Sequence, residues 1–316
     1  MNSSTPLWMW AGFFAIVLAL MVFDLGLLHR KEREIGVRES LWLSCGYIFI
    51  SLCFGGLVNH YLGGHAGKDF FTAYFIEKSL SMDNILVMSM VFAHFQIPRQ
   101  HQHRVLFWGI LGVIILRGLM IGLGSALVQE FHFVLYFFGA FLIVTGIRML
   151  FFGEKEEEKS LEENKLLAWL RKRIPVTKEL YGKKFFVREP GILPATSVRR
   201  ATPLFLTLVF IELADVVFAV DSIPAVFAIT TDTFVVYTSN IFAILGLRSM
   251  YFALAAMLHR FAYLKYALAL VLTFIGAKIF LAKFVEISSG PSLCVTLGLL
   301  IGGVLLSLYK TRGGKH

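Results

Sequence analysis

Acidic side chains interrupt two strongly apolar stretches of the sequence, with the same spacing in both. An acid stands six positions before an aspartate, and a small polar residue and an isoleucine follow that aspartate. The two copies are Glu77, Asp83, Asn84, Ile85 and Asp215, Asp221, Ser222, Ile223. Glu212 adds an acid ahead of the second copy, and neither copy contains His or Cys. Oxygen ligands of this kind suit hard cations such as Mg²⁺, Ca²⁺ or Mn²⁺, and they do not suit zinc or copper.

These acids are costly where they stand. Placing one Asp at the centre of a membrane helix costs about 2.5–3.5 kcal/mol, so five unpaired acids would cost about 10–15 kcal/mol. Bound cations, protonation, water or basic partners could offset that cost. The basic candidates are Lys78, Arg117 and Arg248, and further accessory candidates are Asp24 and Asn240. One open alternative is that the acids pair with Arg117 and Arg248 and only lock the helices together.

The composition identifies the elements that must carry these residues. Hydrophobic residues make up 57% of the 316 residues and charged residues only 16%, and the mean hydropathy is +0.72. Such a chain cannot cover itself with polar surface, so we predict an all-α, polytopic membrane helix bundle. About nine apolar stretches are long enough to cross a bilayer: 8–28, 41–62, 71–93, 105–127, 133–152, 203–229, 237–257, 263–284 and 291–309.

Basic residues in the connections predict the orientation. Most of the 30 Lys and Arg residues fall in alternate connections and in the C-terminal tail. The positive-inside rule therefore places the N-terminus outside and the C-terminus in the cytoplasm of a cell (inner) membrane. This distribution also accounts for the net charge of +9, and no motif indicates a nucleic-acid partner.

A weak internal repeat relates the two acidic stretches. Leu116-Arg117 in the span after the first motif matches Leu247-Arg248 in the span after the second. Gly146-Ile147-Arg148 then matches Gly276-Ala277-Lys278. Each unit contains three helices, and an odd number turns the second unit upside down. The sequence therefore predicts a 3+3 inverted repeat, with a site near mid-membrane where the repeats meet.

The spacing of the acids also bears on helix geometry. Glu212 and Asp221 would point in opposite directions on a regular helix, because nine residues at 100° each make two and a half turns. Pro224 removes an amide donor nearby. We therefore expect both acidic helices to unwind near Asp83-Asn84 and Asp221-Ser222, which would free carbonyl oxygens as ligands.

The predicted divisions of the chain follow from these elements. They are 1–62 for two N-terminal helices, 69–152 for the first repeat, 153–200 for a cytoplasmic loop, 201–284 for the second repeat, and 285–316 for the last helix and a basic tail. Within the loop, 166–173 is either an amphipathic helix on the inner leaflet or a solvated connector. Residues 183–188 favour a short strand, and a protein partner would bind through this loop.

At these residues the sequence resembles the TerC/Alx family of integral membrane proteins, over nearly the whole chain. The resemblance rests on the strings at 77–80 with 83–84, 212–215, 218–225, 238–248, 185–188 and 201–204. It implies a superfamily of exporters that includes LysE-like carriers, manganese efflux with Mn²⁺ as the transported substrate, and a link to tellurium resistance. It also implies that the metal is bound by Glu77, Asp83, Glu212, Asp215 and Asp221, together with Asn84, and Asp24 fits the family pattern.

Several functions stay open from the sequence. The first is export of Mn²⁺, with possible coupling to protons. The second is transport of Ca²⁺ or a small organic cation by the same fold. The third is a non-transporting membrane partner that loads metal into exported enzymes or serves tellurium resistance. An enzyme is not expected, because the paired aspartates lack the Gly-Asp sequence of an intramembrane protease.

Overall fold

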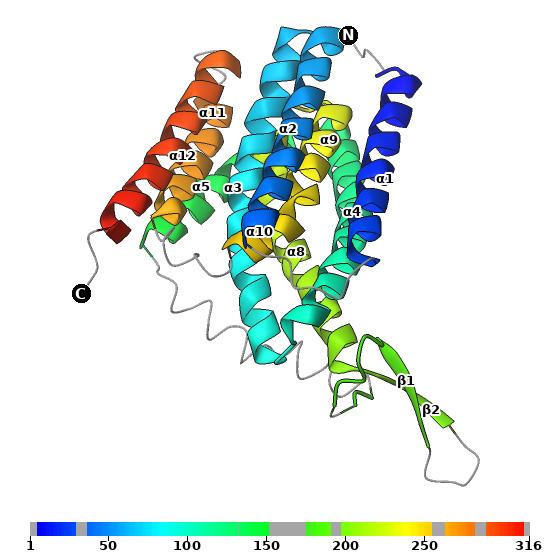
Figure 1. Cartoon of the computed structure of the whole chain (residues 1–316). Coiled ribbons are helices and arrows are strands. Elements are labelled where there is room, and N and C mark those ends of the chain that lie inside the picture. The colour runs from blue at the N-terminus through cyan, green and yellow to red at the C-terminus, as the bar shows by residue number, and fades with distance from the viewer. Residues whose placement is uncertain are drawn as a thin grey trace.

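The computed structural model describes residues 5–29, 37–131, 133–151, 175–177, 179–190, 197–254, 263–281 and 289–312. Helices dominate this part of the chain, as the sequence predicts, and they pack into one bundle (Figure 1). The helices are α1 Leu7–His29, α2 Val37–Leu62, α3 Gly64–His94, α4 Arg99–Glu130, α5 Phe133–Phe151, α8 Pro203–Phe227, α9 Thr233–Leu245, α10 Leu247–Leu254, α11 Leu264–Leu281 and α12 Ser289–Arg312.

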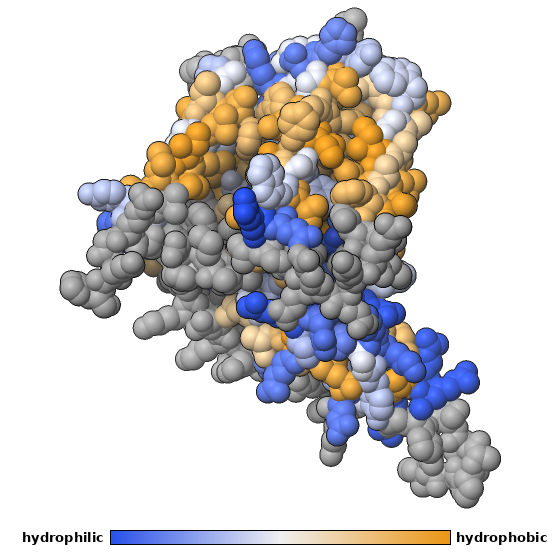
Figure 2. Space-filling model, viewed as in Figure 1, coloured by the Kyte–Doolittle hydropathy of each residue, from blue (hydrophilic) through white to orange (hydrophobic). Residues whose placement is uncertain are grey.

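The outer surface of the bundle is apolar, as a lipid-facing surface must be. Within the described residues, seven helices are long and apolar enough to cross a membrane, with α9 and α10 together forming one of them. Large apolar side chains such as Leu7, Trp42 and Leu305 are exposed on α1, α2 and α12. Figure 2 shows the resulting apolar band across this face, with polar residues gathered beneath it. The polytopic membrane bundle is thus confirmed. Of the remaining predicted spans, 71–93 lies within α3, and 263–284 contains α11.

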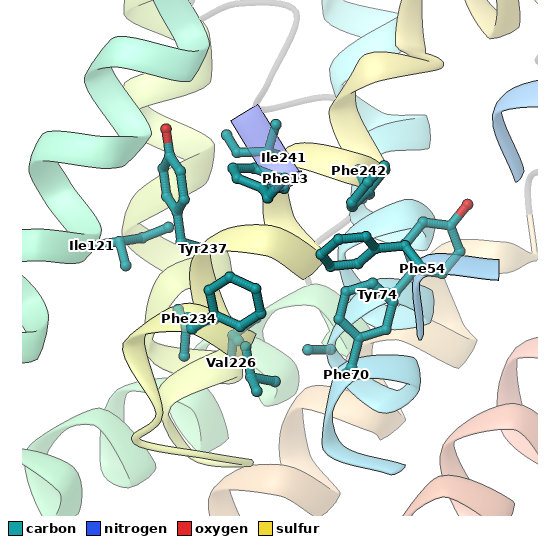
Figure 3. Packing of buried hydrophobic residues seen from close by; sticks show 14 of the residues in the cluster. Phe13, Phe54, Phe70, Tyr74, Ile121, Val226, Phe234, Tyr237, Ile241 and Phe242 are labelled. Carbon is teal, nitrogen blue, oxygen red and sulfur yellow. The ribbon is translucent and has the colours of Figure 1, made fainter. Parts of the chain in front are cut away.

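The interior of the bundle contains two kinds of close packing. Aromatic rings from α1, α2 and α9 interlock, with the centroids of Phe54 and Phe242 4.6 Å apart (Figure 3). On the other side, α5 and α11 approach so closely that a Cβ on Gly276 would lie 2.6 Å from the carbonyl oxygen of Gly139. The rings fix the α2–α9 side, and small residues permit the α5–α11 contact.

The predicted inverted repeat stays a prediction, and some of the helix contacts are those that it would require. If α3, α4 and α5 correspond to α8, α9 and α11, a twofold operation exchanges the pair α3–α9 with the pair α8–α4. Both pairs pack extensively, and so do α3 on α8, α4 on α9 and α5 on α11, which the same operation maps onto themselves.

The predicted unwinding of the two acidic helices is wrong. Helix α3 continues through Asp83 and Asn84, and α8 continues through Asp221 and Ser222. Pro224 lies in the last turn of α8, so its missing amide removes one hydrogen bond without ending the helix. The break occurs instead at Gly246, which separates α9 from α10.

Two strands extend beyond one end of the bundle (Figure 1). Strand β1, Phe186–Pro190, pairs antiparallel with β2, Ser197–Ala201, with Phe186 opposite Ala201. The strand expected at 183–188 is therefore present, shifted towards the C-terminus, and its partner strand was not predicted. The expected amphipathic helix at 166–173 lies outside the described residues.

Candidate cation site

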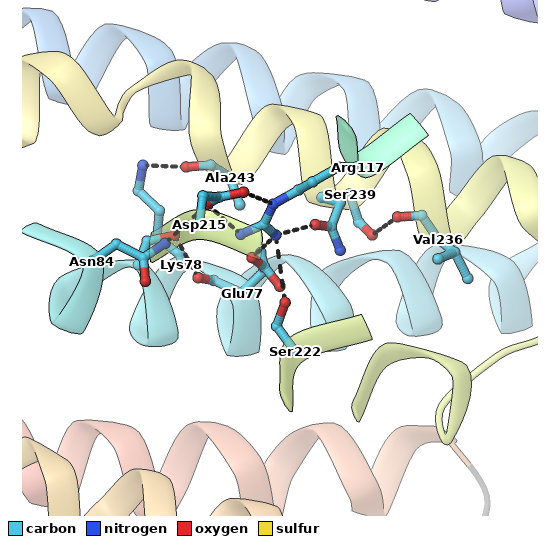
Figure 4. A network of polar contacts seen from close by, with 11 residues as sticks. Glu77, Lys78, Asn84, Arg117, Asp215, Ser222, Val236, Ser239 and Ala243 are labelled. Carbon is cyan, nitrogen blue, oxygen red and sulfur yellow. Dashed lines mark hydrogen bonds and ion pairs between the residues drawn. The ribbon is translucent and has the colours of Figure 1, made fainter. Parts of the chain in front are cut away.

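Arg117 is the centre of a buried polar network between four helices. It lies on α4 with 0% of its surface exposed. Its Nε and Nη2 donate to Oδ2 and Oδ1 of Asp215 on α8, at 3.0 and 2.9 Å. Its Nη1 donates to Oε1 of Glu77 on α3 (Figure 4). One guanidinium thus joins the two acids that occupy equivalent positions in the predicted repeats.

Three polar side chains complete this network, which we call the Arg117 cluster. Asn84 on α3 donates from Nδ2 to Oδ1 of Asp215 at 3.3 Å. Asn240 on α9 and Ser222 on α8 accept from Nη1 of Arg117. The Arg117 cluster therefore comprises Glu77, Asn84, Arg117, Asp215, Ser222 and Asn240. Its arginine–carboxylate pairs agree with the alternative that arginine neutralises the acids.

The cluster contains polar atoms that the described residues leave without partners. These atoms are Oε2 of Glu77, Oδ1 of Asn84 and Nδ2 of Asn240. All three side chains are at least nine-tenths buried. A buried polar atom without a hydrogen bond costs about 1–3 kcal/mol. Two of the three atoms are oxygens, so the cluster retains free acceptors beside Arg117.

Two other predicted acids of α8 lie outside this network. Oδ1 of Asp221 accepts a hydrogen bond from Thr145 of α5 at 3.4 Å. The carboxylate of Glu212 packs against α4, where a Cβ on Gly112 would lie 2.2 Å from Oε1 of Glu212. Oε2 of Glu212 is buried and has no partner among the described residues. Because α8 is a regular helix, the acids at 215 and 221 face different neighbours.

Two further predicted residues, Lys78 and Asp83, lie on α3. Lys78 donates from Nζ to the carbonyl oxygen of Ala243 on α9 at 3.0 Å. Asp83 lies on α3, and its side chain is outside the described part of the structure. Among the described residues, no three His, Cys, Asp or Glu side chains are grouped so that they could hold a metal ion.

A second arginine pair lies near the break in the α9–α10 span. Nη2 of Arg248, the second residue of α10, contacts Oδ1 of Asp24 on α1 at 2.6 Å. Both side chains are buried. A cavity of about 10 Å³ is lined by Arg248 and by Asp215 of the Arg117 cluster. The pairing of Asp24 with Arg248 was not predicted, because it depends on α1 lying close to α10.

Sequence reasoning also missed Gly112 and Thr145, which determine where Glu212 and Asp221 lie. Gly112 had a readable signal, because it stands three residues after Gly109 on one helix face. Small residues on one helix face allow close helix contacts in membranes, although the usual motif has a spacing of four residues. Thr145 had no comparable signal, since a threonine in a membrane helix usually bonds its own backbone.

Comparisons with known proteins place the chain among membrane proteins. The family model described as "Integral membrane protein TerC family" matches residues 62–315. An uncharacterized membrane protein of Myxococcus xanthus is 45% identical over 304 residues, covering 96% of this chain and 93% of that protein. One from Rickettsia bellii is 43% identical over 301 residues, covering 95% and 97%.

A relative from Escherichia coli has a name that proposes a membrane-bound redox modulator, Alx. It is 42% identical over 325 residues, covering 98% of each chain. No solved structure matches the chain. The matched length and these identities show that the chain belongs to the TerC family of integral membrane proteins.

Proposed function

We propose that this protein is a secondary transporter that exports a divalent metal ion, with Mn²⁺ as its main cargo. One observation carries the proposal: Glu77 and Asp215 meet at a single fully buried guanidinium between helices α3, α4 and α8. Buried ionisable groups inside a membrane bundle are costly and mark ion pathways. An arginine that pairs with two carboxylates holds the place that a bound cation would otherwise take, and its single positive charge offsets only one of the two negative charges.

The chemistry of the donors fits a hard cation. Carboxylates of Glu77 and Asp215 and the free amide oxygen of Asn84 supply oxygen ligands. Oxygen donors suit Mn²⁺, Mg²⁺ and Ca²⁺. In this proposal Asp83, Glu212 and Asp221 form the path by which the ion reaches or leaves the Arg117 cluster. Proton exchange could accompany metal binding, because carboxylates that lose a cation take up protons more readily.

The orientation and repeat belong to the same proposal. The pairs α3–α9 and α4–α8 are those that an inverted repeat would exchange. The strands β1 and β2 extend from one end of the bundle and carry Arg188, Arg199 and Arg200. We place that end in the cytoplasm of the inner membrane, since basic residues gather on that side. The N-terminus would then lie outside and the C-terminus inside.

Other readings differ in what they require of the cluster. Ca²⁺ takes six to eight oxygen ligands and Mn²⁺ prefers six, so competition between the two ions in one flux assay separates these cargoes. A redox role, as the name of the Escherichia coli relative proposes, would need a redox-active group. Cys45 and Cys53 lie eight residues apart on α2, about 12 Å along a helix, which is too far for a disulfide, and Cys294 on α12 is also a free cysteine. A role in metal loading or tellurium resistance would require the same cation site without flux.

Flux in purified proteoliposomes tests the proposal. We expect vesicles containing the protein to move Mn²⁺, and we expect Asp215→Asn and Glu77→Gln to abolish this movement. Matched controls are Asp69→Asn on α3 and Glu130→Gln at the end of α4, which remove the same charges elsewhere. Equal Mn²⁺ movement by the parent and both cluster variants, or none by the parent, would refute the proposal.

A further inference from the structure

Two arginines stand at equivalent positions of the predicted repeats but have different partners. Arg117 contacts Asp215 and Glu77, one acid from each repeat. Arg248 contacts Asp24 of α1, which lies outside both repeats. If the two repeats exchanged their conformations, Arg248 would reach the same acids that Arg117 contacts now.

Arg248 has spare hydrogen-bonding capacity on a buried side chain. Its side chain is 4% exposed, and its Nη1 has no partner among the described residues. A guanidinium has five donor hydrogens in a fixed fork, and a buried arginine normally uses most of them. The single carboxylate of Asp24 therefore leaves Arg248 incompletely satisfied.

One small cavity adjoins both Arg248 and Asp215. Both residues line the cavity of about 10 Å³, together with Gly109. The match between Leu116-Arg117 and Leu247-Arg248 places Gly109 at the repeat position of Asn240. Asn240 fills the space beside Arg117 and accepts a hydrogen bond from it. Gly109 has no side chain at the equivalent position, and it lines the same small cavity as Arg248 and Asp215.

The start of α10 gives Arg248 the freedom to use that space. Arg248 is two residues after Gly246, where the α9–α10 span is interrupted. A Cβ on Gly246 would lie 3.1 Å from both Lys78 Nζ and Tyr47 Cβ, so the chain passes closely between α3 and α2 at this point. A helix break beside a buried charge is where a membrane span can change its partners.

We propose that Arg248 alternates between Asp24 and Asp215, and that it neutralises the Arg117 cluster when Arg117 leaves it. The proposal rests on the proposed transport function and its inverted repeat. In the present state Arg117 occupies the cluster and Asp24 holds Arg248. In the opposite-facing state of the empty carrier Arg248 binds Asp215, and the cargo binds during the interval when neither arginine does.

The first test needs no cargo and uses the melting temperature of the purified full-length protein. If Arg248 can turn to Asp215, Asp24→Asn melts close to the parent, and adding Arg248→Gln does not raise the melting temperature. If Arg248 can pair only with Asp24, Asp24→Asn leaves a buried unpaired charge and melts well below the parent. Adding Arg248→Gln would then restore the melting temperature, and that result would overturn the proposal.

The second test measures Mn²⁺ flux with Asp24 neutral in both arms. Asp24→Asn/Arg248→Lys keeps a cation that can reach Asp215, and we expect it to retain measurable flux. Asp24→Asn/Arg248→Gln lacks that cation, and we expect about ten-fold lower flux, since the opposite-facing state loses its counter-charge. Equal flux in the two variants would overturn the proposal.

The two tests separate this inference from the proposed function. If the parent carries no Mn²⁺ into vesicles, the proposed function fails, and the melting temperatures still decide whether Arg248 changes partners. If the parent carries Mn²⁺ but Arg248→Gln restores the stability of Asp24→Asn, only the inference fails.

Discussion

Asp215 and Asp221 lie on one helix, six residues apart, and their surroundings differ sharply. Asp215 is 4% exposed and is held by two nitrogens of Arg117 and by Asn84. Asp221 is half-buried and has one long hydrogen bond, from Thr145. The two acids look alike in the motif, but Asp215 belongs to a tight ion cluster and Asp221 is held by one long hydrogen bond. The first acid is tied to a buried cation, and the proposed function gives the second a place on the ion path.

Removal of Arg117 should have the largest effect on this comparison. Arg117→Gln leaves Glu77 and Asp215 buried without a cation, and breaking such a pair costs about 3–5 kcal/mol. We expect a large fall in the melting temperature of the purified protein, whereas Asp221→Asn should melt near the parent. Arg99→Gln, at the exposed start of α4, is the matched control. Equal melting of Arg117→Gln and the control would show that the cluster contributes nothing to stability.

Displacement of Glu212 should have an intermediate effect. A Cβ at position 112 would overlap the Glu212 carboxylate, so Gly112→Ala must push that flexible side chain aside. We expect about 1–3 kcal/mol of destabilisation, typical of overpacking, and a clear loss of Mn²⁺ flux. Gly122→Ala on the same helix meets nothing within 4 Å and serves as the control. If both alanine variants transport like the parent, the position of Glu212 is unimportant.

Neutralisation of Asp221 should affect stability least and flux strongly. Thr145→Val removes one long hydrogen bond, worth about 0.5–1.5 kcal/mol, whereas Asp221→Asn keeps an amide oxygen that can accept it. We expect Thr145→Val to keep most of the flux and Asp221→Asn to lose it, because only the second change removes the charge on the path. Full flux in Asp221→Asn, measured in the same vesicles, would place Asp221 outside the ion path.

Much of the fold can be predicted from the sequence because long apolar stretches identify the membrane spans. All nine predicted spans contain helices, and the candidate role of Arg117 as a counter-charge followed from the cost of buried acids. The helices extend beyond the apolar stretches, as for α4, which begins at Arg99 rather than 105. Hydropathy reports the part of a helix within lipid, and it does not report where the backbone hydrogen bonds end.

The unpredicted features depend on contacts between distant segments. A proline suggested a break in α8, yet Pro224 lies where only one hydrogen bond is lost, and the interruption is at Gly246. The pairing of Arg248 with Asp24 requires α1 to lie near α10, which no local pattern encodes. The division between Asp215 and Asp221 follows from the regularity of α8, which the expected unwinding would have removed.

The most direct test of the account is a structure of the protein with Mn²⁺, read by anomalous scattering. The account predicts one manganese peak between α3 and α8, within about 2.0–2.6 Å of carboxylate oxygens of Glu77 and Asp215, with the Arg117 guanidinium moved away from both. A protein that transports Mn²⁺ but shows Arg117 still bound to both acids, with the manganese peak elsewhere, would contradict it.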